Sequence, residues 1–328
     1  MNRTYCTLFD KNYLPHFLSL HDSLKSNVPY FVIYAFCMDD ESYNFLLKSE
    51  SKNIIPISYI ELENHFTDLK IAKSNRTIIE YYFTCTSAIC SFVFDNYSET
   101  GLLTYLDADL YFFSSPEPIY KELKGASVGI IEHKFNFFGK LLYEKYGKYN
   151  VGWTSFNNDK VGRKCLEEWR INCLNWCYDR LENGQFADQK YLDYWVEKYF
   201  GVQIIKNIGA NLAPWNVGKY KIKIDSKTKA VKVDKQNLIF YHFASFKQLD
   251  VSEYKTNISL YFTYLSTKIK QIIYLPYLAS LRKYNKEIGV EFNIKNRTDN
   301  RHKGFSKKMK ELSYLLRRFI FNDNIKIK

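Results

Sequence analysis

The chain has 328 residues, of which 46% are hydrophobic and 25% charged, a balance that excludes a disordered protein and allows one or two domains with buried cores. Its net charge of +12 is uneven, because residues 301–328 hold nine basic and two acidic residues. Seven cysteines without a CxxC pair exclude a zinc finger and favour a reduced, cytoplasmic protein.

Strands and helices are predicted to alternate along the first 250 residues. Residues 30–37 (YFVIYAFC) form a continuous apolar run, typical of a strand buried on both faces of a parallel sheet. The predicted strands are residues 3–9, 30–37, 54–59, 101–106, 126–132, 151–156, 202–206 and 238–242. The predicted helices are residues 13–26, 41–49, 77–94, 160–181 and 187–199. This order predicts a doubly wound α/β domain over residues 1–250, followed by a helical, basic region over residues 251–328.

No membrane-spanning or secretory segment is expected. The longest uncharged stretch, residues 81–94, is shorter than the ~20 apolar residues that a spanning helix needs. Residues 1–9 lead directly into Asp10 and Lys11, so they lack the apolar length of a secretory signal.

Asp107 and Asp109 interrupt an otherwise apolar run, LLTYLDADLYFF, directly after the strand predicted at residues 101–106. In an extended backbone both carboxylates project to the same side, and Ala108 points away. Two unpaired charges there would cost several kcal/mol unless they met a cation. The pattern therefore favours a divalent metal site over a simple turn at the strand end. Such a site at the carboxyl end of a central strand has open positions for phosphate oxygens.

Three further groups have residue types suited to a ligand site. His242 ends the apolar run LIFYHF, where it is either a core histidine or a metal ligand. Asp188 and Gln189 follow a break in the chain and begin a predicted helix, where they either cap the helix or bind sugar hydroxyls. Cys173 and Cys177 are spaced to share a helix face, as buried thiols or as part of a metal site.

Five short segments, taken in their order and spacing, resemble the retaining glycosyltransferases of the GT-A fold, family 8 and its bacterial relatives. The segments are FDKNY (9–13), YLDAD (105–109), NVG (150–152), ADQ (187–189) and YHFASFK (241–247). The resemblance implies a GT-A fold, a Rossmann-like and mostly parallel sheet with flanking helices.

The resemblance also implies a role for each matching residue. Asp107, Asp109 and His242 would bind Mn²⁺ or Mg²⁺, and Asp188 and Gln189 would be the catalytic residues at the anomeric carbon. The implied donor-binding residues are Thr7, Asp10, Asn12, Tyr13, Arg76, Ala108, Asn150 and Lys247. Among these, Tyr13 would stack on uracil and Lys247 would contact the diphosphate.

The implied activity is metal-dependent transfer of a hexose from a UDP-sugar, with retention, to a glycan or lipid-linked acceptor in cell-surface polysaccharide or lipopolysaccharide biosynthesis. A sugar-phosphate nucleotidyltransferase is an alternative on the same fold, but its Gly-rich phosphate loop is missing after the first strand, where residues 9–12 read FDKN. A non-enzymatic basic module for lipid or nucleic acid would not use the aligned acidic, amide and imidazole groups. We therefore expect no nucleic-acid partner.

The basic tail has the pattern of an amphipathic helix. Its apolar residues recur at helical spacing and are Phe305, Met309, Leu312, Leu316, Phe319 and Ile320. Its opposite face carries Lys307, Lys310, Arg317 and Arg318. This pattern favours an anchor on an anionic membrane over a helix docked on the core, and so predicts a cytoplasmic protein peripherally associated with the inner face of the membrane.

Overall fold

A seven-stranded sheet forms the centre of the computed structural model, which describes residues 2–137, 139, 141–289 and 319–327. In spatial order its strands are β3 (Ile54–Ser58), β2 (Phe31–Cys37), β1 (Arg3–Phe9), β4 (Leu102–Leu106), β7 (Tyr149–Asn157), β6 (Val128–Glu132) and β8 (Val202–Ile205). Strand β7 is antiparallel to both of its neighbours, and the other pairs are parallel. The predicted α/β fold with a mostly parallel sheet is confirmed.

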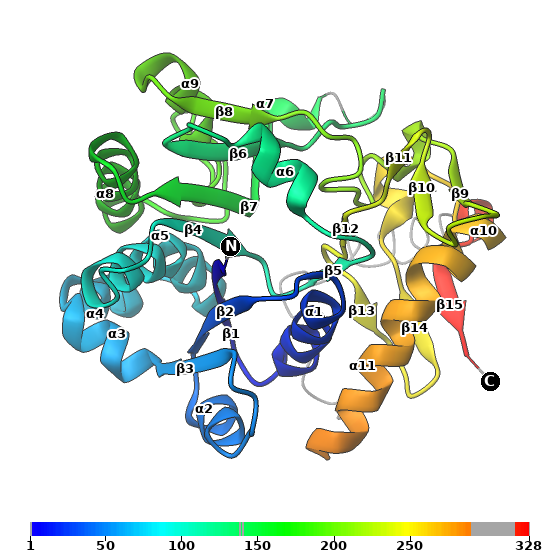
Figure 1. The fold of residues 1–328 in the computed structure, drawn as a ribbon, viewed down its shortest axis with the longest axis horizontal. Helices are drawn as coiled ribbons and strands as arrows, with labels where there is room; N and C mark the ends of the chain where they lie inside the picture. Colours follow the sequence, from blue (N-terminus) through cyan, green and yellow to red (C-terminus); the bar gives the residue numbers. More distant parts are fainter. Residues whose placement is uncertain (1, 138, 140, 290–318, 328) are drawn as a thin grey trace, which may run out of the picture.

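Helices cover both faces of this sheet. Figure 1 shows α3, α4, α5 and α8 on one side of the sheet and α1 and α11 on the other. The helices are α1 (Leu14–Asn27), α2 (Asp40–Leu47), α3 (Tyr59–His65), α4 (Asp68–Ser74), α5 (Ile78–Asn96), α6 (Glu117–Glu122), α7 (Leu142–Tyr146), α8 (Lys160–Asn175), α9 (Trp195–Lys198), α10 (Thr267–Ile269) and α11 (Leu275–Ile288). None of the helices in the described residues is long and apolar enough to cross a bilayer.

Side chains along the central strands point alternately to the two faces of the sheet, and this separates the hydrophobic core into two layers. On β1, Tyr5 packs with the residues around α1, whereas its neighbour Cys6 packs against α5 on the opposite face. Ile33 and Tyr34 on β2 divide in the same way. Successive side chains of a strand point to opposite faces, so a sheet covered on both faces needs apolar residues at nearly every position.

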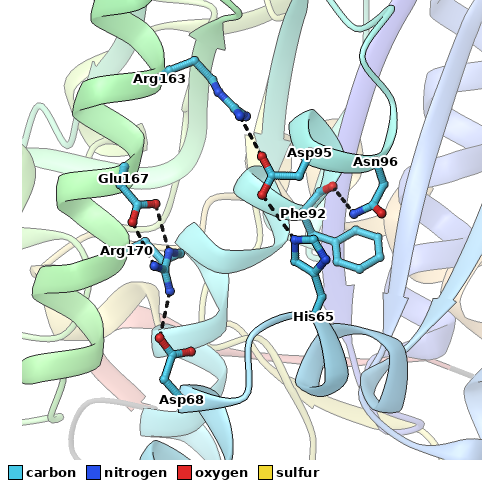
Figure 2. Close-up of polar contacts among 8 residues, drawn as sticks. All are labelled: His65, Asp68, Phe92, Asp95, Asn96, Arg163, Glu167 and Arg170. Carbon is cyan, nitrogen blue, oxygen red and sulfur yellow. Dashed lines mark hydrogen bonds and ion pairs between the residues drawn. The ribbon is translucent and has the colours of Figure 1, made fainter.

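A surface network of ion pairs joins the helices on the α5 side, as Figure 2 shows. Arg163 of α8 and His65 of α3 both contact the carboxylate of Asp95, at 2.7 and 3.2 Å. Arg170 of α8 lies 3.1 Å from Asp68 of α4 and also pairs with Glu167. Because most of these groups are partly exposed, each pair contributes about 0.2–1 kcal/mol.

Short strands outside the main sheet form three small sheets, one of which contains His242. The two-stranded sheet pairs β5 (Leu110–Phe112) with β12 (Phe240–His242). One three-stranded sheet contains β9 (Ile222–Ile224), β10 (Val231–Val233) and β11 (Gln236–Asn237). A second three-stranded sheet contains β13 (Lys247–Gln248), β14 (Glu253–Lys255) and β15 (Asn324–Lys326). The antiparallel register aligns His242 with Leu110, one residue after Asp109.

The described residues beyond 250, 251–289 and 319–327, pack closely on the rest of the chain. Helix α11 lies against α1, where the Ser280 hydroxyl donates to that of Ser19 at 3.0 Å. Strand β15 pairs with β14, and the buried Asp323 carboxylate accepts a 2.6 Å hydrogen bond from Thr256. The domain boundary near residue 250 stays a prediction. Residues 305–318 of the predicted amphipathic helix lie outside the described residues, and the last two apolar positions, Phe319 and Ile320, are exposed.

Two predicted helices differ from the structure. Helix α8 ends at Asn175, not near residue 181, because Trp176 has an extended backbone (φ −152°, ψ 120°) and its carbonyl accepts the hydroxyl of Tyr191 at 2.7 Å. The helix predicted at residues 187–199 is replaced by a 3-10 helix, η1 (Lys190–Tyr194), and the single turn of α9. Ala187 has φ 47°, a left-handed conformation that an α-helix cannot contain. Asp188 and Gln189 therefore do not lie in the first turn of a long helix.

Candidate metal centre

Asp107, Asp109 and His242 converge at the carboxyl end of β4. Their ligand atoms all lie within 4.8 Å of one another, with Nε2 of His242 3.4 Å from Asp107 Oδ2 and 3.1 Å from Asp109 Oδ1. The backbone between the aspartates is a turn and not extended, because the Leu110 N–H donates to the Asp107 carbonyl at 3.2 Å. The structure brings the three residues together through a turn and through the pairing of β5 with β12, and their role as metal ligands stays a prediction.

Neighbouring groups fix the orientation of these side chains. The hydroxyl of Tyr105 donates to Asp107 Oδ1 at 2.8 Å, which leaves Oδ2 facing His242. Oδ1 of Asn150 accepts the backbone N–H of Gly152 and lies 3.2 Å from Nδ1 of His242. Since this oxygen is an acceptor, Nδ1 carries the proton of the neutral ring and Nε2 presents its lone pair to the aspartates.

Gly152 is required by this packing. A Cβ atom at this position would lie 2.8 Å from both Asn150 Oδ1 and His242 Nδ1, so any larger residue would displace the imidazole or its partner. The Gly152 carbonyl also accepts the N–H of Asp107 at 3.1 Å, which ties β7 to the turn that carries the carboxylates.

The three titratable groups influence one another strongly. Burial raises the pKa of Asp107, and the charge of Asp109 adds to this rise. Burial by itself would raise the pKa of Asp109, but the charge and the hydrogen bond of His242 outweigh it and lower this pKa. Burial by itself would lower the pKa of His242, but the two carboxylates outweigh it and raise the pKa. A proton on His242 and a cation between the carboxylates therefore compete for the same negative charge.

The donor set fits a hard or borderline divalent cation such as Mn²⁺ or Mg²⁺. Two carboxylate oxygens and one imidazole nitrogen are ligands that these ions accept. A metal-binding histidine typically donates its second N–H to a fixed acceptor, the role that Asn150 fills for His242. Three protein ligands leave positions open for oxygens of another molecule.

Asp188 lies beside this cluster and is buried. Burial, together with the charge of Asp107, raises the pKa of Asp188 to about 7. Its backbone carbonyl accepts the indole N–H of Trp169 at 2.8 Å, which fixes the segment on α8. Gln189 follows it and is partly buried. The structure therefore brings Asp188 near Asp107, and the catalytic roles of Asp188 and Gln189 stay predictions.

The loop after β1 forms a second part of the same sheet edge, because β1 and β4 are parallel neighbours. Oδ1 of Asp10 accepts the backbone N–H groups of Asn12 and Tyr13 at 2.9 and 3.3 Å, which folds the loop into a tight turn. Tyr13 is 37% exposed. Thr7, on β1, is buried, and its hydroxyl has no hydrogen-bond partner among the described residues.

The remaining predicted donor residues are spread more widely. The Arg76 guanidinium donates to the Leu174 carbonyl at 2.5 Å and to the Thr84 hydroxyl, so it joins the start of α5 to the end of α8. Ala108 is buried between the two aspartates, and Lys247 is exposed on β13. Their contacts with a donor stay predictions.

The Trp of a Pro/Trp loop and the cysteines are buried. Trp215, in the Pro/Trp loop over residues 211–216, is 4% exposed, so its ring packs inside the protein. All seven cysteines are buried free thiols, which confirms this interpretation for Cys173 and Cys177.

Sequence patterns miss four residues that hold the site together. Tyr105 and Gly152 each lie two positions from a predicted site residue in a strand, and this period of two could have identified them. His16 lies one helical turn after Tyr13, and its charge helps to lower the pKa of Asp109. Tyr277, whose hydroxyl lies 2.6 Å from Nδ1 of His16, has no signal in the sequence because 261 residues separate the two.

Comparison of the sequence with known proteins identifies relatives in Bacillus subtilis (strain 168). YfnF is 32% identical over 263 residues, which cover 78% of this chain and 85% of YfnF. The chain belongs to the YfnF family. YfnD is 29% identical over 290 residues, covering 88% of this chain and 91% of YfnD. Both relatives are described as uncharacterized proteins, and no protein-family model matches the chain.

Solved structures share the fold at low sequence identity. The galactosyltransferase LgtC, in complex with donor and acceptor sugar analogs, is 15% identical with a TM-score of 0.50, over 74% of this chain and 87% of LgtC. The apo form of the glycosyltransferase GlyE of Streptococcus pneumoniae TIGR4 is 14% identical with a TM-score of 0.50, over 90% of this chain and 66% of GlyE. The bifunctional glycosyltransferase WbbM is 12% identical with a TM-score of 0.51, over 88% of this chain and 51% of WbbM. The likeness confirms the predicted GT-A fold.

Proposed function

We propose that this protein is a metal-dependent glycosyltransferase that uses a nucleotide diphosphate sugar. The observation that carries the proposal is the cluster of Asp107, Asp109 and His242 at the end of the central strand β4. The exposed ring of Tyr13 follows the adjacent strand β1 at the same edge of the sheet. A cation site and an aromatic platform at one edge suit the two ends of a nucleotide diphosphate, and ligands of open α/β sheets bind at this edge.

Asp107, Asp109 and His242 would hold Mn²⁺ or Mg²⁺, which when bound supplies positive charge to the departing diphosphate. Tyr105 and Asn150 orient two of these ligands before the donor arrives. Such preorganised charge stabilises a leaving group without reorganisation during the reaction.

The donor is proposed to be a UDP-sugar, and its hexose is transferred with retention. Asp188 would bind the donor hydroxyls, and Gln189 would approach the reacting face of the anomeric carbon. The position of Asp188 near Asp107 supports this assignment, because the sugar is attached to the diphosphate that the metal would bind. A front-face path through an oxocarbenium-like state fits an amide, which is a poor nucleophile, and Asp188 is the alternative nucleophile.

The acceptor is proposed to be a glycan or a lipid-linked sugar in cell-surface polysaccharide or lipopolysaccharide assembly. The LgtC structure contains donor and acceptor sugar analogs on the same fold, which supports a sugar acceptor. The basic tail would bring the site to the cytoplasmic face of an anionic membrane.

Release of UDP from a panel of UDP-sugars tests the proposal. We expect release from one or a few donors in the presence of Mn²⁺, loss of release with EDTA, and recovery when Mn²⁺ is restored. Asp107→Asn should remain inactive at every Mn²⁺ concentration, whereas Asn96→Ala, a variant of an exposed residue at the end of α5 labelled in Figure 2, should behave as the wild type. Metal-independent release, or no release from any nucleotide sugar, would reject the proposal.

A further inference from the structure

Four aromatic rings, from the start of α1, from α11 and from the residue after β12, contact one another in series and are here called the column. The ring of Tyr13 stacks on His16 with centroids 4.8 Å apart and planes 28° apart. Nδ1 of His16 lies 2.6 Å from the hydroxyl of Tyr277 on α11, and Tyr277 stacks on Phe243 at 3.7 Å and 16°. Of the two end rings, Tyr13 is 37% exposed and Phe243 is buried.

The buried end of the column joins the metal centre through the backbone. Phe243 follows the metal ligand His242, and its N–H donates to the carbonyl of Asp109 at 3.0 Å. The column therefore connects the turn that carries the carboxylates to the exposed ring of Tyr13.

Helix α11 is held firmly where it supplies the central member of the column. Tyr277 is fully buried, and further along the helix Ser280 bonds to Ser19 and Lys283 pairs with Asp22, both on α1. His16 lies in the first turn of the same α1, so α1 and α11 form one support for Tyr13.

We propose that Tyr277 and His16 are positioning residues that set the span between the base-stacking ring of Tyr13 and the metal ligands. The inference rests on the proposed function, because it assumes a nucleotide diphosphate with its base on Tyr13 and its diphosphate at the metal. A ligand whose base and diphosphate bind at two separate sites gains affinity from both only when the distance between the sites matches the ligand. If the ring of Tyr13 were mobile, each binding event would also have to restrict its motion, which costs affinity. The described part of the region after residue 250 thus belongs to the donor site through Tyr277.

Tyr277→Phe tests the inference, because it keeps the ring and removes only the hydroxyl that bonds to His16. We expect the dissociation constant for UDP in the presence of Mn²⁺ to rise roughly fivefold to tenfold, the effect of losing one hydrogen bond of ordinary strength. The dissociation constants for Mn²⁺ alone and for inorganic diphosphate with Mn²⁺ should change less than twofold, because neither ligand reaches the base platform. Calorimetry measures the UDP and diphosphate affinities, and electron paramagnetic resonance of free Mn²⁺ measures the metal affinity.

Tyr274→Phe is the matched control. Tyr274 is equally buried, and its hydroxyl lies 2.9 Å from that of Tyr241, so this variant also loses one buried hydroxyl pair. It should lower the melting temperature as Tyr277→Phe does and leave the UDP affinity unchanged. His16→Phe, which keeps a ring under Tyr13 without the nitrogen, is a second variant that should weaken UDP binding as Tyr277→Phe does.

The outcomes separate the inference from the proposed function. If UDP and inorganic diphosphate weaken together, or if UDP binds Tyr277→Phe and His16→Phe as tightly as the wild type, the positioning role is wrong while the proposed function stands. If the wild-type protein binds neither UDP nor inorganic diphosphate with Mn²⁺, the proposed function fails and this inference fails with it.

Discussion

Nδ1 of His242 lies 3.2 Å from Oδ1 of Asn150, and this contact decides which nitrogen of the imidazole faces Asp107 and Asp109. The acceptor oxygen is itself held by the backbone N–H of Gly152 at 3.2 Å. The ring is therefore oriented from β7, the strand next to β4, before any cation arrives. Partners of this kind affect metal affinity nearly as much as the ligands themselves.

Asn150→Ala is expected to weaken Mn²⁺ binding about tenfold to 100-fold, because the imidazole loses the acceptor that fixes its tautomer. Titration of Mn²⁺ by electron paramagnetic resonance measures the effect without a donor present. Asn96→Ala, which removes an amide that donates to the Phe92 carbonyl of its own helix, is the control. Wild-type Mn²⁺ affinity in Asn150→Ala would show that the contact does not orient a ligand.

Neutral replacements of the two aspartates should have opposite effects on stability while both abolish sugar transfer. The raised pKa of Asp107 means that the fold disfavours its ionised form, so Asp107→Asn should stabilise the metal-free protein at pH 7. The lowered pKa of Asp109 means that the fold favours its ionised form, so Asp109→Asn should cost about 1–3 kcal/mol. Urea unfolding with EDTA measures both, and a loss of stability of the same size in both variants would contradict the different environments assigned to the two carboxylates.

Asp188 should make the metal-free protein less stable as the pH rises from about 4 to about 7. Its folded pKa of about 7 exceeds the unfolded value of 3.8, so in this window the unfolded state has released a proton that the folded state keeps. The stabilisation is complete below the unfolded pKa and is lost as the pH passes through the folded pKa, which amounts to at most ~4 kcal/mol. Asp188→Asn should therefore match the wild type near pH 4 and exceed its stability by up to this amount at pH 8, in urea unfolding with EDTA. A constant difference at both pH values would remove the basis for the raised pKa.

Sequence patterns predict the buried strands and the ligand types well, because both depend on local sequence. Residues 30–37 are apolar throughout and residues 101–106 are apolar except at Thr104, and these runs form the strands β2 and β4, buried on both faces. Asp107 and Asp109 stand out because they break such a run. The turn between them depends on the pairing of β5 with β12, which brings residues 110 and 242 together.

Long-range contacts explain what the sequence does not predict. Ala187 adopts a positive φ that its residue type does not favour, so the helix predicted from residue 187 begins later and is short. The contact of His16 with Tyr277 joins two helices whose sequences contain no mutual signal. Patterns within a strand or a helix turn identify single residues, whereas the packing of α1 on α11 is a property of the whole fold.

The product of a UDP-α-sugar is expected to have an α linkage, because the resemblance that assigns Asp188 and Gln189 is to retaining enzymes. The coupling constant of the anomeric proton in the NMR spectrum of the product measures the configuration. A β linkage would place the protein among the inverting enzymes and remove the role proposed for Gln189.

The tail is expected to bind anionic membranes through the basic face of the predicted helix. Removing the tail would be a poor test, because it ends in strand β15, which contains the buried Ile325, and the preceding Asp323 accepts a hydrogen bond from Thr256. Substitution is a more specific test than removal, because changing Lys307, Lys310, Arg317 and Arg318 together to glutamine leaves β15 in place. At about 1 kcal/mol for each cation near the surface, the loss is ~4 kcal/mol, or roughly 1,000-fold in affinity for phosphatidylserine vesicles.

A control variant with the same net charge as the tail variant separates binding through a local anchor from general electrostatic attraction to the membrane. Lys223, Lys227, Lys229 and Lys235 are exposed around the β9–β10 hairpin, and their change to glutamine removes the same four charges elsewhere. We expect this control to bind vesicles nearly as the wild type does in sedimentation at physiological salt, and both variants to retain transfer to a soluble acceptor. Equal losses of vesicle affinity in the two variants would assign the attraction to net charge. Unchanged vesicle binding by the tail variant would mean that the predicted helix docks on the protein itself, because the cations of a docked helix do not bind lipid.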